Sequence, residues 1–225
     1  TSAPRITTVM SGLNSPRGLG FAPNGDLVVV EAGDGTATCT AGVNTMALPP
    51  RGAPICVGTS GSISVVAAGG ADQQRGQTGW PSWRSNTPSQ PFAEVTGPQD
   101  IDFPTMGRAF VTVGWGGTPA ARTELAAKGK AFGRLVQTGP NGKRRTAADI
   151  AGYEQTFNPA GGPVDSNPYG VLAEPGGVFV TDAGANALYQ VKGWNVSLVA
   201  TFPPAQLTCT TPFPAPPVQE SVPTT

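Results

Sequence analysis

Residues 167–186 read NPYGVLAEPGGVFVTDAGAN, and this stretch decides the fold because the chain carries its pattern two more times. The earlier copies are SPRGLGFAPNGDLVVVEAG at residues 15–33 and GPQDIDFPTMGRAFVTVGWG at residues 97–116. In each copy a proline is followed two positions later by Gly or Asp, then by an aliphatic residue, a turn and a β-branched run. This pattern predicts a short strand, a tight turn and a longer buried strand.

The intervals between the copies have room for four strands each. After residue 168 the strand candidates are 169–173, 178–181, 187–191 and 196–201. The second interval adds 110–113, 134–137 and 146–150, with a loop or short helix at 117–130, and the first interval adds 27–30, 62–67 and 92–95. Repeated four-stranded units predict an all-β chain and a β-propeller, whose blades need roughly 40–50 residues before insertions.

The copies also divide the chain, residues 1–225, into parts of a single propeller. We expect blades at 13–97, 98–167 and 168–204, a Pro-rich linker at 205–220, and the start of another blade at 221–225. A strand at 5–10, within residues 5–12, is expected to close the last blade. Because three blades and the start of a fourth leave open faces, the sequence predicts an incomplete propeller that a missing segment or a further chain completes.

Four stretches carry a resemblance to a known family. They are GLNSPRGLGFAPNGDLVVVEAG at 12–33, TGPQDIDF at 96–103, FGRLVQTGPNGK at 132–143 and, above all, ADIAGYEQTFNPAGGPVDSNPYGVLAEPGGVFVTDAGANALYQV at 148–191. They resemble the ScyD/ScyE-type proteins, which are named after scytonemin-biosynthesis clusters and are NHL-like secreted β-propellers. The resemblance spans residues 13–223 and implies the fold, export, and continuation into further blades. It implies no chemistry, because most members lack an assigned activity.

The composition argues against several classes of function. Only 12% of residues are charged, and Lys+Arg and Asp+Glu both number 14, so no basic surface for nucleic acid is expected. Histidine is absent, which disfavours Ser-His-Asp hydrolases, His-ligated zinc, and propeller dehydrogenases and lactonases with a histidine base. No apolar run approaches the ~18 residues of a membrane span.

The cysteines indicate an oxidising compartment. Cys39 and Cys56 bracket a Gly/Pro-rich insertion and are predicted to form a disulfide, which is worth roughly 3 kcal/mol for a loop of this size. Cys209 is then left as a free thiol or as the partner of a cysteine outside the chain. Asn195, Val196 and Ser197 form a sequon for N-glycosylation. Together these features favour a secreted glycoprotein.

The central channel of the expected propeller is the first candidate binding site. Arg17, Gln99 and Tyr169 follow the repeated prolines and are expected to point into the channel, with Asn14 and Asn167 near its mouth. A polar mouth of this kind could bind a ligand. The alternative is that these side chains hydrate the channel or satisfy strand ends.

A central calcium ion is a weaker hypothesis, and no cofactor is expected. Glu31 and Asp182 are weak metal candidates because they follow equivalent strands on separate blades, where turn capping is the ordinary role. The other oxygen donors considered are Asp100, Asn167 and Asn186. Only Asp100 lies on an expected inner strand, and its counterparts are Gly18 and Gly170.

Other chemistry-bearing residues have ordinary structural interpretations. Asp149, Tyr153 and Glu154 could form one helical turn in which the acids cap the turn rather than act as a catalytic pair. Residues 143–145 (KRR) are expected at a solvated hairpin tip. Tryptophans are expected to pack in the core or between blades, although one ring of GWPSW could be exposed as a sugar platform; they are Trp80, Trp83, Trp115 and Trp194.

Two functions from different classes follow. The first is an extracellular, non-catalytic scaffold or binding propeller that engages a protein or glycan partner. The alternative is a propeller enzyme acting on a small molecule at the channel, such as a lactonase-like hydrolase or a tailoring enzyme of a secreted pathway.

Overall fold

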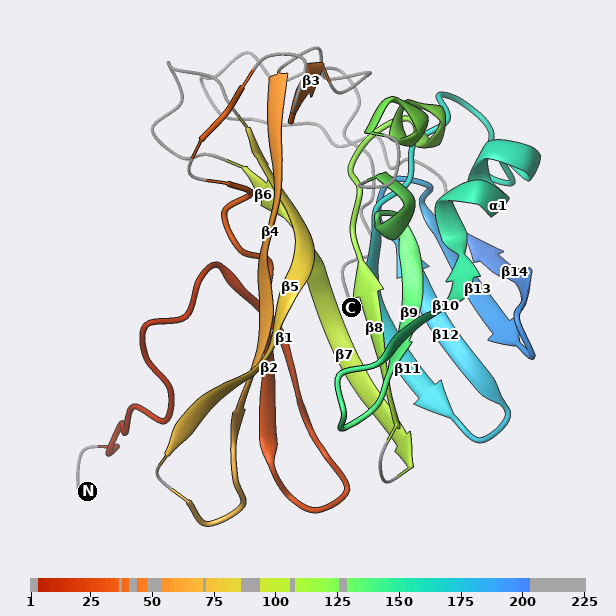
Figure 1. Cartoon of the computed structure of the whole chain (residues 1–225). Helices are drawn as coiled ribbons and strands as arrows, with labels where there is room; N and C mark the ends of the chain where they lie inside the picture. Colours follow the sequence, from red (N-terminus) through yellow and green to blue (C-terminus); the bar gives the residue numbers. More distant parts are fainter. Residues whose placement is uncertain are drawn as a thin grey trace.

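The structure, a computed structural model, describes residues 4–36, 38–40, 44–47, 54–70, 72–85, 94–105, 108–125 and 129–202. The described chain forms three antiparallel sheets joined in sequence order, with short helices between strands (Figure 1). The prediction of an all-β fold is confirmed. The expected linker at 205–220, the blade start at 221–225 and Cys209 lie outside the described residues.

The first sheet has the order β1-β2-β4-β5-β6, and β3 pairs with β4. Its strands are β1 (Pro16–Phe21), β2 (Leu27–Glu31), β3 (Thr45–Ala47), β4 (Pro54–Val66), β5 (Gln73–Ser85) and β6 (Val95–Thr96). The fourth strand was expected at 92–95, but β5 takes this place. The sequence of β5, QQRGQTGWPSWRS, does not predict a strand because it contains no β-branched residue except one Thr.

The second sheet has the order β10-β9-β8-β7. Its strands are β7 (Pro98–Thr105), β8 (Arg108–Val113), β9 (Arg134–Thr138) and β10 (Arg144–Asp149). The helices of the described chain lie in the connection between β8 and β9 and directly after β10. Two 3₁₀ helices, η1 (Pro119–Leu125) and η2 (Gly129–Ala131), occupy the expected loop or short helix. Strand β10 ends one residue early because Asp149 caps helix α1 (Ile150–Phe157) by accepting a hydrogen bond from the Gly152 amide.

The third sheet is the simplest and agrees best with the predicted strands. Its strands follow chain order as β11 (Pro168–Glu174), β12 (Gly177–Asp182), β13 (Ala187–Lys192) and β14 (Asn195–Thr201). Short turns join them, and every neighbouring pair is antiparallel.

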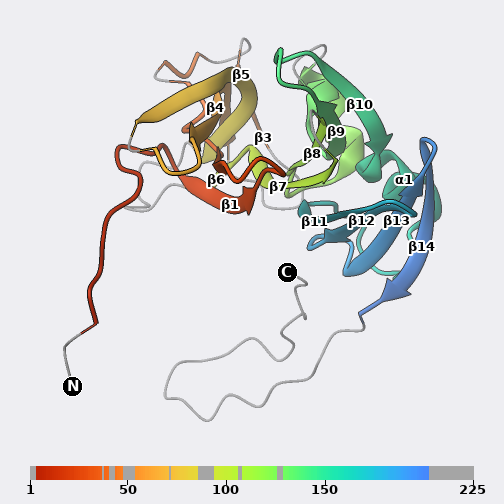
Figure 2. The same cartoon turned by 90° about the horizontal axis from the view of Figure 1, so that it is seen from below.

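The three sheets pack face to face around their first strands. Strands β1, β7 and β11 lie side by side, and the sheets fan outward from them (Figure 2). One core cluster, which includes Val30, Trp83 and Val111, fills the space between the first and second sheets. A second, which includes Ile150, Val180 and Tyr189, lies between the second and third sheets. Within the described residues, the row of sheets does not close into a ring.

The N-terminal segment differs from its prediction. Residues 5–10, expected as a strand that closes the last blade, form no strand and pair with no sheet of the described chain. Instead the following residues contact β5 through side chains. Ser11 exchanges two hydrogen bonds with the Gln73 amide group, and the Gly12 carbonyl accepts one from Arg75.

The predicted disulfide between Cys39 and Cys56 is confirmed, with the two Cα atoms 5.4 Å apart. Cys56 lies in β4 opposite Thr45 of β3, so the bridge ties the insertion to the first sheet beside its short extra strand.

Candidate functional site

The first strands of the sheets are fastened to one another by two carboxylates on β7. Asp100 accepts hydrogen bonds from the backbone amides of Ile101 and Val171, each at 2.9 Å. Asp102 accepts from Phe103 at 2.8 Å and from Ala173 at 2.7 Å. Each acid therefore bridges one amide of its own strand and one of β11. Charge-assisted bonds of this kind are among the stronger hydrogen bonds in proteins.

Asp100 also explains the glycine at the equivalent position of β1. A Cβ atom built on Gly18 would lie 2.1 Å from Asp100 Oδ1 and 2.8 Å from the Asp100 Cα. Only glycine lets β1 come this close to β7. Burial raises the pKa of Asp100, while the hydrogen bonds from Val171 and Ile101 oppose the rise. With its oxygens bonded to amides of β7 and β11, Asp100 acts as a clamp between strands.

Two of the side chains predicted to line the channel, those of Arg17 and Asn167, have hydrogen-bond partners within the described chain. Arg17 Nη2 donates to the Val95 carbonyl at 2.9 Å, and the Asn14 amide donates to Glu31. Asn167 Oδ1 accepts from the Trp115 amide at 3.1 Å. These bonds fasten the starts of the inner strands to neighbouring elements.

Gln99 and Asn167 meet at Gly114. A Cβ atom on Gly114 would lie 2.7 Å from Gln99 Nε2 and 2.6 Å from Asn167 Oδ1. The Gln99 side chain is buried, and its Oε1 atom has no hydrogen-bond partner among the described residues. Tyr169 is half-buried, and its carbonyl accepts from the Thr112 hydroxyl. Gln99 and Asn167 are therefore neighbours, and the backbone of Tyr169 is joined to β8 through Thr112.

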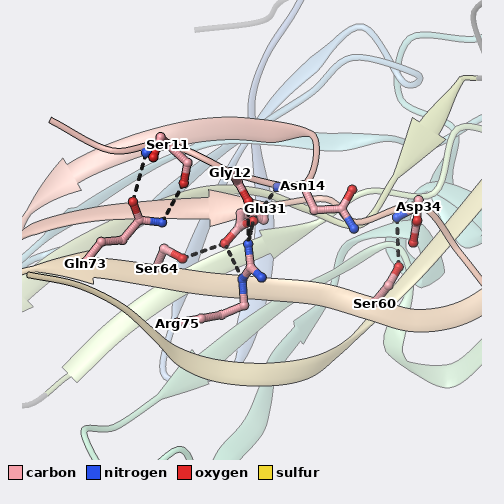
Figure 3. A network of polar contacts seen from close by, with 9 residues as sticks. All are labelled: Ser11, Gly12, Asn14, Glu31, Asp34, Ser60, Ser64, Gln73 and Arg75. Carbon is pink, nitrogen blue, oxygen red and sulfur yellow. Dashed lines mark hydrogen bonds and ion pairs between the residues drawn. The ribbon is translucent and has the colours of Figure 1, made fainter. Parts of the chain in front are cut away.

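Glu31 is the centre of a polar network on the face of the first sheet that points away from the second (Figure 3). Its carboxylate is fully buried and accepts from Arg75 Nη2 at 2.7 Å, from the Ser64 hydroxyl at 2.6 Å and from the Asn14 amide at 2.5 Å. Burial alone would raise the pKa of Glu31, but these hydrogen bonds outweigh it and lower the pKa. The network holds residues 11–14 against the sheet.

Asp182 is the counterpart of Glu31 in the third sheet. It is fully buried and accepts from the Ser166 hydroxyl and the Asn167 amide at 2.6 Å each, and from the amides of Gly184 and Ala185 at 3.0 Å each. The last two bonds form the turn cap expected from the sequence. Burial raises the pKa of Asp182 to about 6.

Glu31 and Asp182 thus serve separate sheets. In the part of the chain that the structure describes, no group of three or more acids or cysteines is placed to hold a metal ion.

Glu154 is a buried acid beneath helix α1. Its carboxylate lies 3.0 Å from the Tyr189 hydroxyl, which donates to it. Burial, aided by the nearby Asp182 and Asp165 and opposed by the hydrogen bond from Tyr189, raises its pKa to about 7. A pKa near neutrality suits acid/base catalysis, but only 1% of Glu154 is exposed, so a substrate has no access to it.

A cleft between the second and third sheets brings together residues that sequence reasoning had treated separately. It has a volume of about 590 Å³ and is lined by Arg108, Arg145, Lys192 and Trp194, among others. Arg145 lies over the Trp194 ring at 3.9 Å from the ring centre. Trp80, Trp83 and Trp115 are buried as expected, whereas 49% of Trp194 is exposed.

In the sequence, the Gly193-Trp194 dipeptide is the feature that could have pointed to this cleft. These two residues form the loop of the β13–β14 hairpin, and both have positive φ, +50° and +79°. Gly and Asn are the residues that normally occupy such loops. A tryptophan between two strand candidates was therefore an anomaly visible in the sequence.

Comparison with known proteins identifies no relative of the chain. No model of a known protein family matches the chain, and a search of curated proteins finds no similar sequence. No helix among the described residues is both long and apolar enough to span a membrane.

Proposed function

We propose that the chain is a portion of an extracellular, NHL-like β-propeller of the ScyD/ScyE type that acts as a non-catalytic binding scaffold. The observation that carries this proposal is the row of three sheets, which packs around adjacent first strands and exposes apolar side chains at both ends. In a propeller each sheet packs between two others, so the outward faces of the first and third sheets each need a further sheet to cover them.

The two outer faces follow from strand alternation. In the first sheet Val28 and Val30 belong to the inner core, so Leu19, which pairs with Val29, and Phe21 lie on the outer face, where both are exposed. In the third sheet Val178 and Val180 face the inner core, so Leu172 lies on the outer face beside its cross-strand partner Phe179. More than half of the Leu172 surface is exposed.

We propose that a second copy of the chain covers these faces, each third sheet packing on the first sheet of the other copy. Two copies supply twice three sheets, which lies within the range of roughly four to eight blades in closed propellers. The chain has no net charge, so two copies do not repel each other over long range.

The acids favour binding over catalysis. Glu174 is the acid among the lining residues of the cleft between the second and third sheets, and Asp26 is the acid of a smaller cleft of about 310 Å³ between the first and second sheets. The acids with raised pKa values, Asp100, Glu154 and Asp182, line neither cleft. A small-molecule enzyme at the channel, the alternative from the sequence, has less support because two of the predicted channel side chains, Arg17 and Asn167, are hydrogen-bonded to the fold.

The disulfide and the exposed Asn195 support the extracellular, glycosylated setting. We expect peptide mass mapping of protein from a eukaryotic secretion host to find a glycan at Asn195.

The test is the mass of the 22.8 kDa chain in solution, measured by light scattering after size-exclusion chromatography. We expect twice this mass for the unmodified chain, and the monomer mass for Leu172→Asp and Leu19→Asp. Phe157→Asp, an equally exposed apolar position on α1 outside both faces, should remain dimeric. A monomeric unmodified chain, or a dimer that survives both face variants, would overturn the proposed assembly.

A further inference from the structure

The cleft between the second and third sheets has the features of a ligand site. It lies where three hairpins turn, at the lower end of these sheets in Figure 1. The β7–β8 hairpin contributes Thr105 and Arg108, the β11–β12 turn contributes residues 174–177, and the β13–β14 loop contributes residues 192–194. Its volume of about 590 Å³ falls within the roughly 300–1,000 Å³ of small-molecule sites.

Positive charge gathers at this cleft in a chain that is otherwise poor in charge. Arg108, Arg145 and Lys192 line it, and Glu174 is the one acid among its lining residues. Arg108 and Arg145 also line an adjoining depression that contains Lys143 and Arg144 and no acid. Five of the 14 basic residues therefore border one continuous surface. Such a surface is complementary to an anion.

The aromatic residue of the cleft is held in a strained backbone conformation. Trp194 has φ of +79°, which is unfavourable for a bulky side chain. Glycine at this position would remove the strain, so the indole ring itself must offset it. Strained residues concentrate at functional sites.

Contacts already orient the cationic side of the cleft. Arg145 donates to Gln137 Oε1 at 2.7 Å while its guanidinium stacks on the Trp194 ring. Arg144 donates to the Gly79 carbonyl at 2.9 Å and lies over Trp80, so it serves the fold. The exposed Arg108 and Lys192 remain available to a ligand beside Arg145. A preorganised cation next to an exposed ring lowers the entropic cost of binding.

We infer that this cleft binds an acidic polysaccharide, with carboxylates of the sugar chain against Arg108, Arg145 and Lys192 and a sugar ring on Trp194. An indole offers a flat apolar surface to the C–H face of a sugar, and guanidinium groups pair with carboxylates in a bidentate manner. Glu174 can accept hydrogen bonds from sugar hydroxyls. Nucleic acid fits less well, because the net charge of the chain is zero, whereas domains that bind nucleic acid are usually strongly basic. The inference deepens the proposed binding role by naming its ligand, and it does not depend on how the ring of sheets closes.

The experiment is calorimetric titration with an oligogalacturonate, using a neutral galactose oligomer of equal length as the control ligand. Bacterially produced protein carries no glycan at Asn195, which follows Trp194 at the start of β14. We expect the unmodified chain to bind the acidic oligomer more weakly as salt is added, and to bind the neutral oligomer at least tenfold more weakly.

The decisive variant is Trp194→Gly. It removes the ring and relieves the positive φ, so we expect at least tenfold weaker binding with no fall in melting temperature. Arg108→Gln combined with Lys192→Gln should also weaken binding at least tenfold and reduce its dependence on salt. Arg5→Gln is the matched control, because Arg5 is exposed on the N-terminal segment, far from β13 and β14 (Figure 2), and should bind normally.

Several outcomes would overturn the inference. They are absence of binding by the unmodified chain, unchanged binding by Trp194→Gly and the double variant, or a preference for a phosphopeptide or an oligonucleotide of equal charge. Because the mass of the assembly is measured separately, failure here leaves the proposed scaffold intact, and dissociation of the dimer leaves the ligand site testable.

Discussion

Gly18 shows at the residue scale how one position depends on another far along the chain. The repeat aligned it with Asp100 and Gly170. The structure shows why position 18 is glycine where position 100 is Asp, since the Asp100 carboxylate fills the space that a side chain at position 18 would need. The disulfide was predictable because its cysteines flank one insertion. The Glu31–Arg75 ion pair was not, because its partners lie on strands whose pairing the sequence did not reveal.

We predict that Gly18→Ala destabilises the fold by about 2–3 kcal/mol, because the added Cβ would overlap the Asp100 carboxylate. The midpoint of chemical denaturation measures the loss. Gly76→Ala in β5 is the control, since its nearest neighbour would be 3.8 Å away, and should change stability by less than about 0.5 kcal/mol.

A double-variant cycle separates this clash from a general preference for glycine. When Asp100 is replaced by Gly, the further change Gly18→Ala should cost less than it does in the unmodified chain, because the carboxylate is gone and only the close approach to the Cα atom of residue 100 remains. An equal cost in both backgrounds would show that the Asp100 side chain does not contribute to the clash.

At the scale of single elements, predictability follows residue type. The third sheet was predicted strand by strand because its strands are rich in apolar and β-branched residues and short turns separate them. Strand β5 was missed because Gln, Gly and Trp dominate it, and it is held by its long pairing with β4 rather than by its own propensity. The short helix α1 was visible as one turn, but the acid beneath it was assigned to capping. In the structure Asp149 caps the helix, whereas Glu154 points into the core beside Tyr189.

Glu154 gives helix α1 a dependence on pH. Its pKa in the folded protein is about 7, against an ordinary value of 4.5, so between these values the folded protein keeps a proton that the unfolded chain has released. The stabilisation is complete below about pH 4.5 and is lost as the pH rises through 7, by up to about 3 kcal/mol. We predict that the free energy of unfolding falls over this range.

The variant Glu154→Gln should remove most of this pH dependence, leaving the part below about pH 6 that comes from the raised pKa of Asp182. Denaturation curves at pH 5, 6, 7 and 8 provide the measurement. Glu124→Gln, an exposed acid on η1, is the control and should keep the slope of the unmodified chain. A Glu154→Gln protein with the full slope would contradict the assignment.

At the scale of the whole molecule, different kinds of contact join the sheets. The first and second sheets share a large apolar core, to which the Trp83 indole adds a hydrogen bond to the Trp115 carbonyl at 2.9 Å. The second and third sheets share a separate core, and their first strands are joined by the carboxylates of Asp100 and Asp102. The sequence repeats predicted that similar sheets would recur. They could not predict that Asp100 and Asp102 of β7 bind the backbone of β11, because the other repeats do not have an acid at the position of Asp100.

We therefore predict that replacing Asp100 and Asp102 together by Ala loosens the third sheet selectively. The change removes the acceptors of the Val171 and Ala173 amides, and a lost hydrogen bond to a charged group costs about 1.5–3 kcal/mol. Hydrogen exchange, measured residue by residue, should accelerate at least tenfold for these two amides and rise together across β12 and β13. The amides of β2, which have no contact with these acids among the described hydrogen bonds, should exchange at their original rates, as should all amides in the control Asp34→Ala, an exposed loop acid. Uniform acceleration in all three sheets would mean that they unfold as one unit, and the carboxylates would then stabilise the whole row rather than the junction they span.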